Sequence, residues 1–288
     1  MHVFVTGATG WVGSAVVHEL LAAGHRVTGQ ARSPDKAAAL RGLGAGVVQA
    51  TLQDLDTLRD AAAAADAVVH TAFDHDFAHF IAHCAQDQRV IQALGDALRG
   101  TRRPLLVTSG LLGVRRGGNE TDLPDPASPR RSEPAARALA DAGICAATVR
   151  LPPSVHGLGE HGFVPILIEL ARRSGVSAYL DEGQNCWSGV HRHDAARVYR
   201  YALEQGAGVP VYHAIADEAV PFKQIAEVIG KHLKLPVASR GAEHFGWFAR
   251  MAGADMAASS SATRALLGWA PVGPELIADL DQPGYYAR

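Results

Sequence analysis

The chain has 288 residues, of which 48% are apolar, so it can bury a large core as one α/β domain or as a domain with an attached lobe. A formal net charge of -2 at pH 7 gives it no basic surface for nucleic acid or for an acidic membrane. The three cysteines are an odd number without a C-x-x-C spacing, which argues against a disulfide framework and against a cysteine zinc site.

The start of the chain and its apolar runs bear on where the protein works. Met1 leads directly into a strand-like run, which leaves no room for a signal peptide. No uncharged apolar stretch is long enough to span a bilayer. We therefore expect a cytoplasmic protein that acts on a small molecule and binds neither nucleic acid nor a membrane.

Strand-like runs alternate with alanine-rich segments of helical period in the first half of the chain. The expected strands are 2–6, 25–31, 45–50, 67–72, 104–109 and 144–150. The expected helices between them are 11–23, 34–43, 54–65, 75–99 and 131–143. Because parallel neighbours need a crossover connection, this alternation predicts an α/β fold with a doubly wound parallel sheet over residues 1–150.

The pattern changes after residue 150. Helix-like pieces separated by Pro and Gly turns follow, at 163–174, 194–205, 221–233, 241–251 and 263–267. One more strand is expected at 209–215, where it would return to the sheet. We predict that residues 151–288 form a smaller, mostly helical substrate lobe on the carboxyl edge of the sheet.

The first strand is followed by the glycine-rich stretch TGATGWVG, from Thr6 to Gly13. Gly7 permits a tight turn, Gly10 lets the backbone approach a pyrophosphate, and Gly13 lets the helix lie close to the strand. The helix N-terminus supplies free N–H groups and the positive end of the helix dipole. The position of the loop between a strand and a helix therefore predicts a dinucleotide site.

The choice of dinucleotide depends on the end of the second strand. An acidic residue there binds the ribose 2′-hydroxyl in NAD-binding proteins of this fold. Residues 30–34, QARSP, contain no carboxylate, whereas Arg32 offers a fork of donors and Ser33 a hydroxyl to a 2′-phosphate. We expect NADP (NADPH), although Arg32 as a solvated loop charge is the alternative.

Several motifs in order along the chain resemble one enzyme family. They are TGATGWVG, Asp54-Leu55 after the third strand, His70-Thr71-Ala72 ending the fourth, Thr108-Ser109 ending the fifth, RLPPSVHG from Arg150, and LGWAP from Leu267. The chain resembles the extended and atypical short-chain dehydrogenase/reductases (SDRs), which include NAD-dependent epimerases and dehydratases. The resemblance covers essentially the whole chain and implies a Rossmann fold that binds NAD(P).

The resemblance also implies which residues contact the cofactor. Asp54 and Leu55 would contact the adenine, and the segment 151–155 would lie beside the nicotinamide. Together with the glycine loop and the end of the second strand, the expected cofactor-binding residues are Gly7, Thr9, Gly10, Trp11, Val12, Gly13, Arg32, Ser33, Asp54, Leu55, Thr71, Ala72, Phe73, Thr108, Leu151, Pro153 and Ser154.

The sequence departs from the family at its catalytic motif. The family usually uses Ser with the Tyr and Lys of Y-x-x-S-K, where the tyrosine moves the proton that accompanies hydride transfer. The matching segment here is PRRSE, with Pro129 in place of Tyr and Glu133 in place of Lys. Ser109 is left as hydrogen-bond donor to a carbonyl oxygen. His156, where the family often has Tyr, is the expected proton donor, and a packed histidine is the alternative.

We therefore expect an NADP-dependent carbonyl reductase without the usual Tyr/Lys pair. A sugar-nucleotide epimerase or dehydratase and a non-catalytic NADP-binding regulator are the alternatives. Expected substrate-binding residues are His75, Asp76, His161, Tyr179, Trp187 and His191. Ordinary surface or core roles remain open for each of them.

His75, His79 and His83 share a spacing that a metal site would need, because residues four apart lie on one helix face. No H-E-x-x-H motif accompanies them, and the resembled family uses no metal in its chemistry. The matching helix often forms a dimer contact in that family. We therefore expect a polar packed face and a homodimer contact rather than a metal site.

Overall fold

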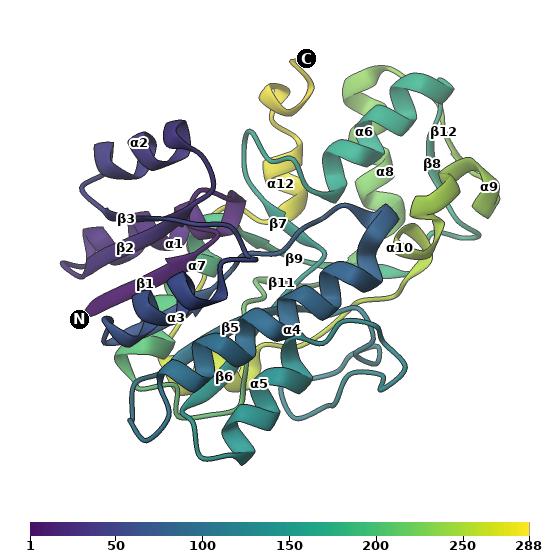
Figure 1. Ribbon diagram of the computed structural model, residues 1–288. Helices are drawn as coiled ribbons and strands as arrows, with labels where there is room; N and C mark the ends of the chain where they lie inside the picture. Colours follow the sequence, from purple (N-terminus) through teal and green to yellow (C-terminus); the bar gives the residue numbers. More distant parts are fainter. Residues whose placement is uncertain (288) are drawn as a thin grey trace.

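A parallel sheet of seven strands forms the centre of the protein (Figure 1), whose computed structural model describes residues 1–287. The strand order is β10-β6-β5-β4-β1-β2-β3. The strands are β1 (His2–Thr6), β2 (Arg26–Ala31), β3 (Gly46–Gln49), β4 (Ala67–His70), β5 (Leu105–Gly110), β6 (Ala146–Leu151) and β10 (Val211–His213). The predicted fold class is confirmed, and each of the six strands expected before residue 151 contains or overlaps one of β1–β6.

Helices cover both faces of this sheet because the strand side chains alternate between two apolar layers. On one face Val3, Val5 and Leu106 pack with α1 (Trp11–Ala22), α2 (Pro34–Gly42) and α7 (Arg192–Glu204). On the other face Phe4 and Val107 pack with α3 (Leu55–Ala63), α4 (Phe80–Ala97) and α5 (Ser132–Asp141). A short 3-10 helix, η1 (Phe77–His79), precedes α4.

The rest of the chain forms a lobe beside the sheet (Figure 1). Its helices are α6 (Phe163–Ser174), α8 (Phe222–Leu233), α9 (Ala242–Phe245), η2 (Gly246–Phe248), α10 (Ala249–Gly253), α12 (Leu276–Leu280) and η3 (Pro283–Tyr286). Helix α11 (Ser261–Leu267) packs instead on α7 and β10 of the main sheet. The lobe also contains two small sheets that the sequence pattern did not indicate. They consist of β7 (Ser154–His156), β9 (Cys186–His191) and β11 (Asp217–Pro221), and of β8 (Ser177–Tyr179) and β12 (Val237–Ser239). Most of these strands are too short to show a period in the sequence.

The two parts of the protein share elements. Helix α7 packs along α1 on the main sheet, and β10 pairs with β6 as the last strand of that sheet. Among the helices within residues 1–287, none combines the length and the apolar character that crossing a membrane requires.

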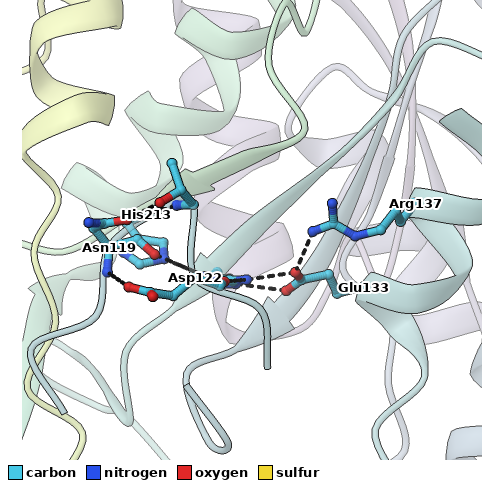
Figure 2. A network of polar contacts seen from close by, with 7 residues as sticks. Asn119, Asp122, Glu133, Arg137 and His213 are labelled. Carbon is cyan, nitrogen blue, oxygen red and sulfur yellow. Dashed lines mark hydrogen bonds and ion pairs between the residues drawn. The ribbon is translucent and has the colours of Figure 1, made fainter. Parts of the chain in front are cut away.

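A buried ion pair joins α5 to β6 (Figure 2). Arg150 is fully buried and donates two hydrogen bonds to the carboxylate of Glu133, at 2.7 Å from Nε and 2.6 Å from Nη2. Its Nη1 is 3.0 Å from His213 Nε2, and its Nη2 also donates to the carbonyl oxygen of Asp122. Burial lowers the pKa of His213, so the neutral ring can accept that bond. The network ties the loop before α5 to the edge of the sheet.

Replacing Glu133 with Ala should therefore destabilise the fold, because Arg150 would remain as a buried cation without its carboxylate. Removing one partner of a buried ion pair costs about 3–5 kcal/mol, and urea denaturation should show a loss of that size in the free energy of unfolding. Asp56→Ala is the matched control, since it breaks a surface pair with Arg59 in which the Asp56 side chain is 91% exposed. The control should lose at most about 1 kcal/mol. Equal small losses in both variants would contradict this role for Glu133.

Candidate functional site

The turn between β1 and α1 requires glycine at two positions. Gly7 has a φ of +63°, a left-handed conformation that residues with side chains rarely adopt. A Cβ atom on Gly7 would also lie 2.7 Å from the backbone nitrogen of Ala72, just beyond β4. A Cβ atom on Gly13 would overlap the carbonyl oxygen of Gly7 and lie 2.6 Å from Thr71 Oγ1. These close contacts hold α1 directly against the turn and against the end of β4.

The N-terminus of α1 is arranged to receive an anion. The helix begins at Trp11, and its N-cap residue Gly10 is exposed and has no side chain that could cap it. The backbone N–H groups of the first turn therefore remain for a ligand, and the helix dipole adds positive potential there. Thr9 and Val12, on either side, are half-buried. A phosphate group fits this position.

Trp11 connects the turn to the lobe. Its Nε1 donates a hydrogen bond of 2.7 Å to the carbonyl oxygen of Val155, and the guanidinium of Arg192 lies 4.1 Å from the centroid of its ring. The ring of His161 meets it edge-on, with centroids 5.8 Å apart. The side chain of Trp11 thus packs with the lobe, and only its backbone belongs to the anion-binding end of α1.

Gln30 fixes the position of the turn, and the sequence analysis did not single it out. This buried side chain accepts a hydrogen bond from the backbone nitrogen of Gly7 at 3.0 Å. Its Nε2 donates to the carbonyl oxygen of Ala50 at 2.5 Å, so one amide links the turn to the end of β3. The sequence feature that could have indicated Gln30 is an uncharged amide in the last residues of a buried strand.

The residues expected on the adenine side lie at the ends of β2 and β3. Arg32 directly follows β2 and is exposed, while the Ser33 hydroxyl accepts a backbone hydrogen bond as the N-cap of α2. Asp54 accepts two hydrogen bonds of 2.7 Å from Thr51, one from its backbone nitrogen and one from its hydroxyl. These bonds hold the pKa of Asp54 below its usual value. Leu55 is the first residue of α3.

Three expected cofactor residues follow β4 at the carboxyl edge of the sheet. Thr71 donates its hydroxyl hydrogen to the carbonyl oxygen of Thr6 at 2.7 Å, and Ala72 lies against Gly7. The ring of Phe73 lies beneath a guanidinium, with Arg130 Cζ 3.7 Å from its centroid. The end of β4 and the glycine turn therefore form one continuous edge.

Thr108 and Ser109 lie just before Gly110, the last residue of β5, with their side chains on opposite faces of the sheet. The Thr108 hydroxyl is hydrogen-bonded to Tyr199 on α7 at 2.8 Å, and burial raises the pKa of Tyr199. Ser109 shares the other face with Val107 and α5, and its residue is 6% exposed. Within residues 1–287 its hydroxyl has no hydrogen-bond partner in the protein. Ser109 is therefore the hydroxyl of this pair that remains for a ligand.

The PRRSE segment places Arg130, for which the sequence pattern predicted no role, at this edge. Its Nε donates to Ser132 Oγ at 2.6 Å, and its Nη2 lies 3.4 Å from the carbonyl oxygen of Thr108. Burial lowers the pKa of this guanidinium, which nevertheless keeps its charge. Glu133 of the same segment is bound to Arg150 instead. The sequence feature that could have indicated Arg130 is a cation one residue after the position of the family's tyrosine.

A buried chain of hydrogen bonds leads from Arg130 back to the glycine turn. Ser132 Oγ donates to one carboxylate oxygen of Asp87 at 2.5 Å, and the other oxygen is 3.0 Å from His70 Nε2. His70 Nδ1 is in turn 2.7 Å from Thr6 Oγ1. Burial opposes ionisation of Asp87, but the hydrogen bond from His70 and the nearby positive charges hold the pKa of Asp87 below its usual value. The chain positions Arg130 relative to the turn.

His156 lies inside the lobe and is fully buried. Its Nδ1 is 2.8 Å from Asp279 Oδ2, which also accepts a hydrogen bond from Tyr285, and its Nε2 is 3.8 Å from Asp217 Oδ2. Burial opposes the charged form, but these two carboxylates raise the pKa of His156. The placement differs from the cleft-facing position expected for a proton donor. It supports the alternative of a packed histidine.

Two neighbours of His156 are also buried with unused polar atoms. Burial raises the pKa of Glu160 to about 8, and its Oε1 has no hydrogen-bond partner within the described residues 1–287. The hydroxyl of Ser154, expected beside the nicotinamide, is also buried without a partner in that part of the chain. Pro153 and Leu151, from the same stretch, are partly exposed. This stretch connects the main sheet to the lobe.

The expected substrate residues are spread over several elements. His75 and Asp76 lie in the segment after β4, with His75 edge-on to Phe73 at 5.2 Å between centroids. His191 lines a cavity of about 320 Å³ at the start of α7. Tyr179 lies on β8 under the ammonium of a lysine, and Trp187 is fully buried in the lobe core. Apolar packing accounts for the position of Trp187.

The histidines before and within α4 do not all share one polar face. Asp76, His79 and His83 offer ligand atoms within 4.8 Å of one another, whereas His75 packs against Phe73. Asp76 Oδ2 and His79 Nδ1 already form a hydrogen bond of 2.8 Å, and both residues are exposed. Asp76 and His79 therefore bind each other on a polar, exposed surface, and we do not propose a metal site at this cluster.

Comparisons with known proteins agree with this geometry. The model of a family described as NAD(P)H-binding matches residues 7–150, which run from the glycine turn to the end of β6. An uncharacterized protein of Schizosaccharomyces pombe is 44% identical over 295 residues, covering 99% of this chain and 100% of that protein. A ketoreductase of Stigmatella aurantiaca, named for a farnesylated 3-oxo-dihydroquinoline oxide, is 27% identical over 237 residues, covering 74% of this chain and 67% of its own.

Solved structures show the same fold at low identity. A dTDP-glucose 4,6-dehydratase from Streptomyces venezuelae with NAD bound superposes with a TM-score of 0.77. It is 19% identical and the match covers 99% of this chain and 97% of that chain. This likeness extends from the sheet through the lobe.

A valine at Gly10 should block a phosphate at the end of α1 without unfolding the sheet. Gly10 is exposed, has an ordinary φ of -78°, and a Cβ there would meet nothing closer than the carbonyl oxygen of Gly7 at 3.2 Å. Gly10→Val should therefore melt near the wild-type temperature and lose most of its dinucleotide affinity in a fluorescence titration. Gly42→Val, in open space at the end of α2, is the control and should bind normally. Full-strength binding by Gly10→Val would show that the anion binds elsewhere.

Proposed function

The chain belongs to the family of NAD(P)H-binding proteins whose model matches residues 7–150, and on that premise we propose that it is an NADP-dependent carbonyl reductase of the extended short-chain dehydrogenase/reductase type. Its substrate is a small organic ketone or aldehyde, or the corresponding alcohol in the reverse direction. The observation that carries this proposal is the common edge formed by the glycine turn, the end of β4, Ser109 and Arg130.

The residues present fit a dinucleotide. The uncapped N-terminus of α1 would hold the diphosphate. A Cβ at Gly7 would collide with the backbone of Ala72, and one at Gly13 with the carbonyl oxygen of Gly7. Thr71, Ala72 and Phe73 would lie along the rest of the molecule at the end of β4. When bound, the nicotinamide supplies or accepts the hydride, and the protein positions the reacting carbonyl.

The preference for NADP rests on the end of β2. Arg32 is exposed there, and the hydroxyl of Ser33 is partly engaged as the cap of α2 at 3.4 Å from Lys36 N. No carboxylate occupies residues 30–34 to bind a free 2′-hydroxyl. An arginine fork can instead bind a 2′-phosphate through paired charge-assisted hydrogen bonds.

Ser109 orients the substrate in this proposal. Its hydroxyl, which has no hydrogen-bond partner within residues 1–287, donates to the carbonyl oxygen and stabilises the negative charge that develops there. The final proton comes from solvent. This assignment is supported by the full burial of His156 and by Pro129 and Glu133 at the positions where the family has Tyr and Lys.

An NADP-binding protein without chemistry is the second candidate. Pro129 and Glu133 favour it, because the usual proton-transferring tyrosine is missing and the carboxylate of Glu133 is committed to Arg150. A protein that binds NADPH tightly and reduces no member of a broad ketone and aldehyde panel would be of this second kind.

Arg32→Ala tests the cofactor. The variant should bind NADPH more weakly by about 1–3 kcal/mol, the scale of a charge-assisted hydrogen bond, and should bind NADH almost as the wild type does. Titration of both cofactors against both proteins measures the difference. Equal losses for NADPH and NADH would overturn the NADP assignment.

Ser109→Ala tests the carbonyl contact. Loss of one donor to the developing oxyanion typically costs about 10²–10³ in kcat, while the affinity for NADPH should stay the same. Ser239→Ala, at the exposed end of β12, is the control and should turn over normally. A kcat within about twofold of the wild type in Ser109→Ala would remove this residue from the mechanism.

A further inference from the structure

The charge of Arg130 has no directly paired carboxylate among the residues that the structure describes. Within residues 1–287 its guanidinium makes no ion pair, and Asp87 is reached only through the hydroxyl of Ser132. Other buried or half-buried arginines, such as Arg150 and Arg200, bind a carboxylate directly. A partly desolvated cation without a direct counter-ion favours an anionic ligand.

The donors of Arg130 that have no partner within residues 1–287 are on Nη1 and Nη2. The group carries five N–H bonds. Ser132 occupies the one on Nε and the carbonyl oxygen of Thr108 faces one on Nη2, which leaves both on Nη1 and the other on Nη2. Phe73 covers one face of the plane at 3.7 Å. An edge with paired N–H bonds matches the two oxygens of a carboxylate.

The charges around Arg130 favour a single negative charge. Desolvation and the positive charge of Arg130 lower the pKa of His75, which disfavours a second cation beside Arg130. The carboxylate of Asp74 is directed to its own loop, where it accepts from the backbone nitrogen of Asp76 and lies 3.9 Å from His83. One unpaired cation therefore faces the ligand, which suits a carboxylate better than a phosphate dianion.

Arg130 is also next to the group that would hold the carbonyl. Its Nη2 lies against the carbonyl oxygen of Thr108, the residue before Ser109. We infer that the substrate is an oxo acid: Ser109 binds its carbonyl oxygen, and Arg130 binds a carboxylate a few bonds away. This inference rests on the proposed reductase function and specifies the substrate class of the same site.

The experiment compares oxo acids with their uncharged esters. With NADPH, kcat/KM is measured for 2-oxobutyrate, acetoacetate and 4-oxopentanoate and for the methyl ester of each. At least one acid should exceed its ester by about 10- to 100-fold, the range of a charge-assisted hydrogen bond pair. Arg130→Met should remove this preference, and Arg130→Lys should keep part of it because the charge remains. Arg131→Met, the exposed neighbour, is the control and should keep all of it.

A binding measurement separates this inference from the reductase proposal. Oxamate and its neutral analogue oxamide are titrated calorimetrically into the wild type and both Arg130 variants, with and without NADP. Oxamate should bind at least about 10-fold more tightly than oxamide, and only when residue 130 is cationic. Melting temperatures show whether each variant is folded. If Arg130→Met does not fold, the comparison is made with Arg130→Lys instead.

The outcomes are distinct. If neither acids nor esters are reduced, the reductase proposal fails, and oxamate binding alone decides the present inference. If the esters are reduced with the same kcat/KM as the acids, the reductase proposal stands, and the inference that the substrate is an oxo acid is overturned. If Arg130→Met weakens NADPH binding but leaves the acid-to-ester ratio unchanged, Arg130 serves the dinucleotide and the inference is also overturned.

Discussion

The close packing of α1 on the Gly7 turn is the constraint that positions the proposed dinucleotide site at the carboxyl edge of the sheet. Any side chain at residue 13 would overlap the carbonyl oxygen of Gly7, and any at residue 7 would meet the backbone of Ala72. Only glycines allow β1, β4 and α1 to meet so closely. As a result, the free N–H groups of α1 and the residues after β4 lie along one edge. Gln30 holds that turn to the end of β3, so its position is fixed from both sides.

The segment 129–133, at the start of α5, lacks the tyrosine and the lysine of the family motif and carries other polar groups in their place. Glu133, at the family's lysine position, accepts two hydrogen bonds from the buried Arg150. A lysine at this position would place a second positive charge beside Arg150 in a buried network. The positive charge of the segment lies instead on Arg130, which is held through Ser132, Asp87 and His70. The cation therefore stays at the carboxyl edge although the lysine is gone.

The lobe is attached to this edge by polar as well as apolar contacts. Trp11 joins the glycine turn to Val155, and Arg192 at the start of α7 lies over the same ring. Behind them, His156 is enclosed by Asp279, Asp217 and Tyr285. The histidine is fully buried, and its carboxylate and hydroxyl neighbours hold it by hydrogen bonds and charge.

The sequence by itself determined the parallel sheet, its order of strands and helices along the chain, and the glycine turn, because hydrophobic periodicity and glycine conformation are local properties. It also pointed to Ser109 by its place at the end of a strand. Which way a side chain turns was decided only by the tertiary structure. Thr108 and Ser109 are adjacent in sequence but face opposite layers. His156, the expected proton donor, is fully buried, whereas Arg130, for which the sequence predicted no role, lies over Phe73 at the end of β4. The physical reason is that buried charged groups are stabilised by partners that lie far away in the sequence. Asp279 is 123 residues from His156, and Asp87 is 43 residues from Arg130. A local sequence pattern does not contain such long-range pairs.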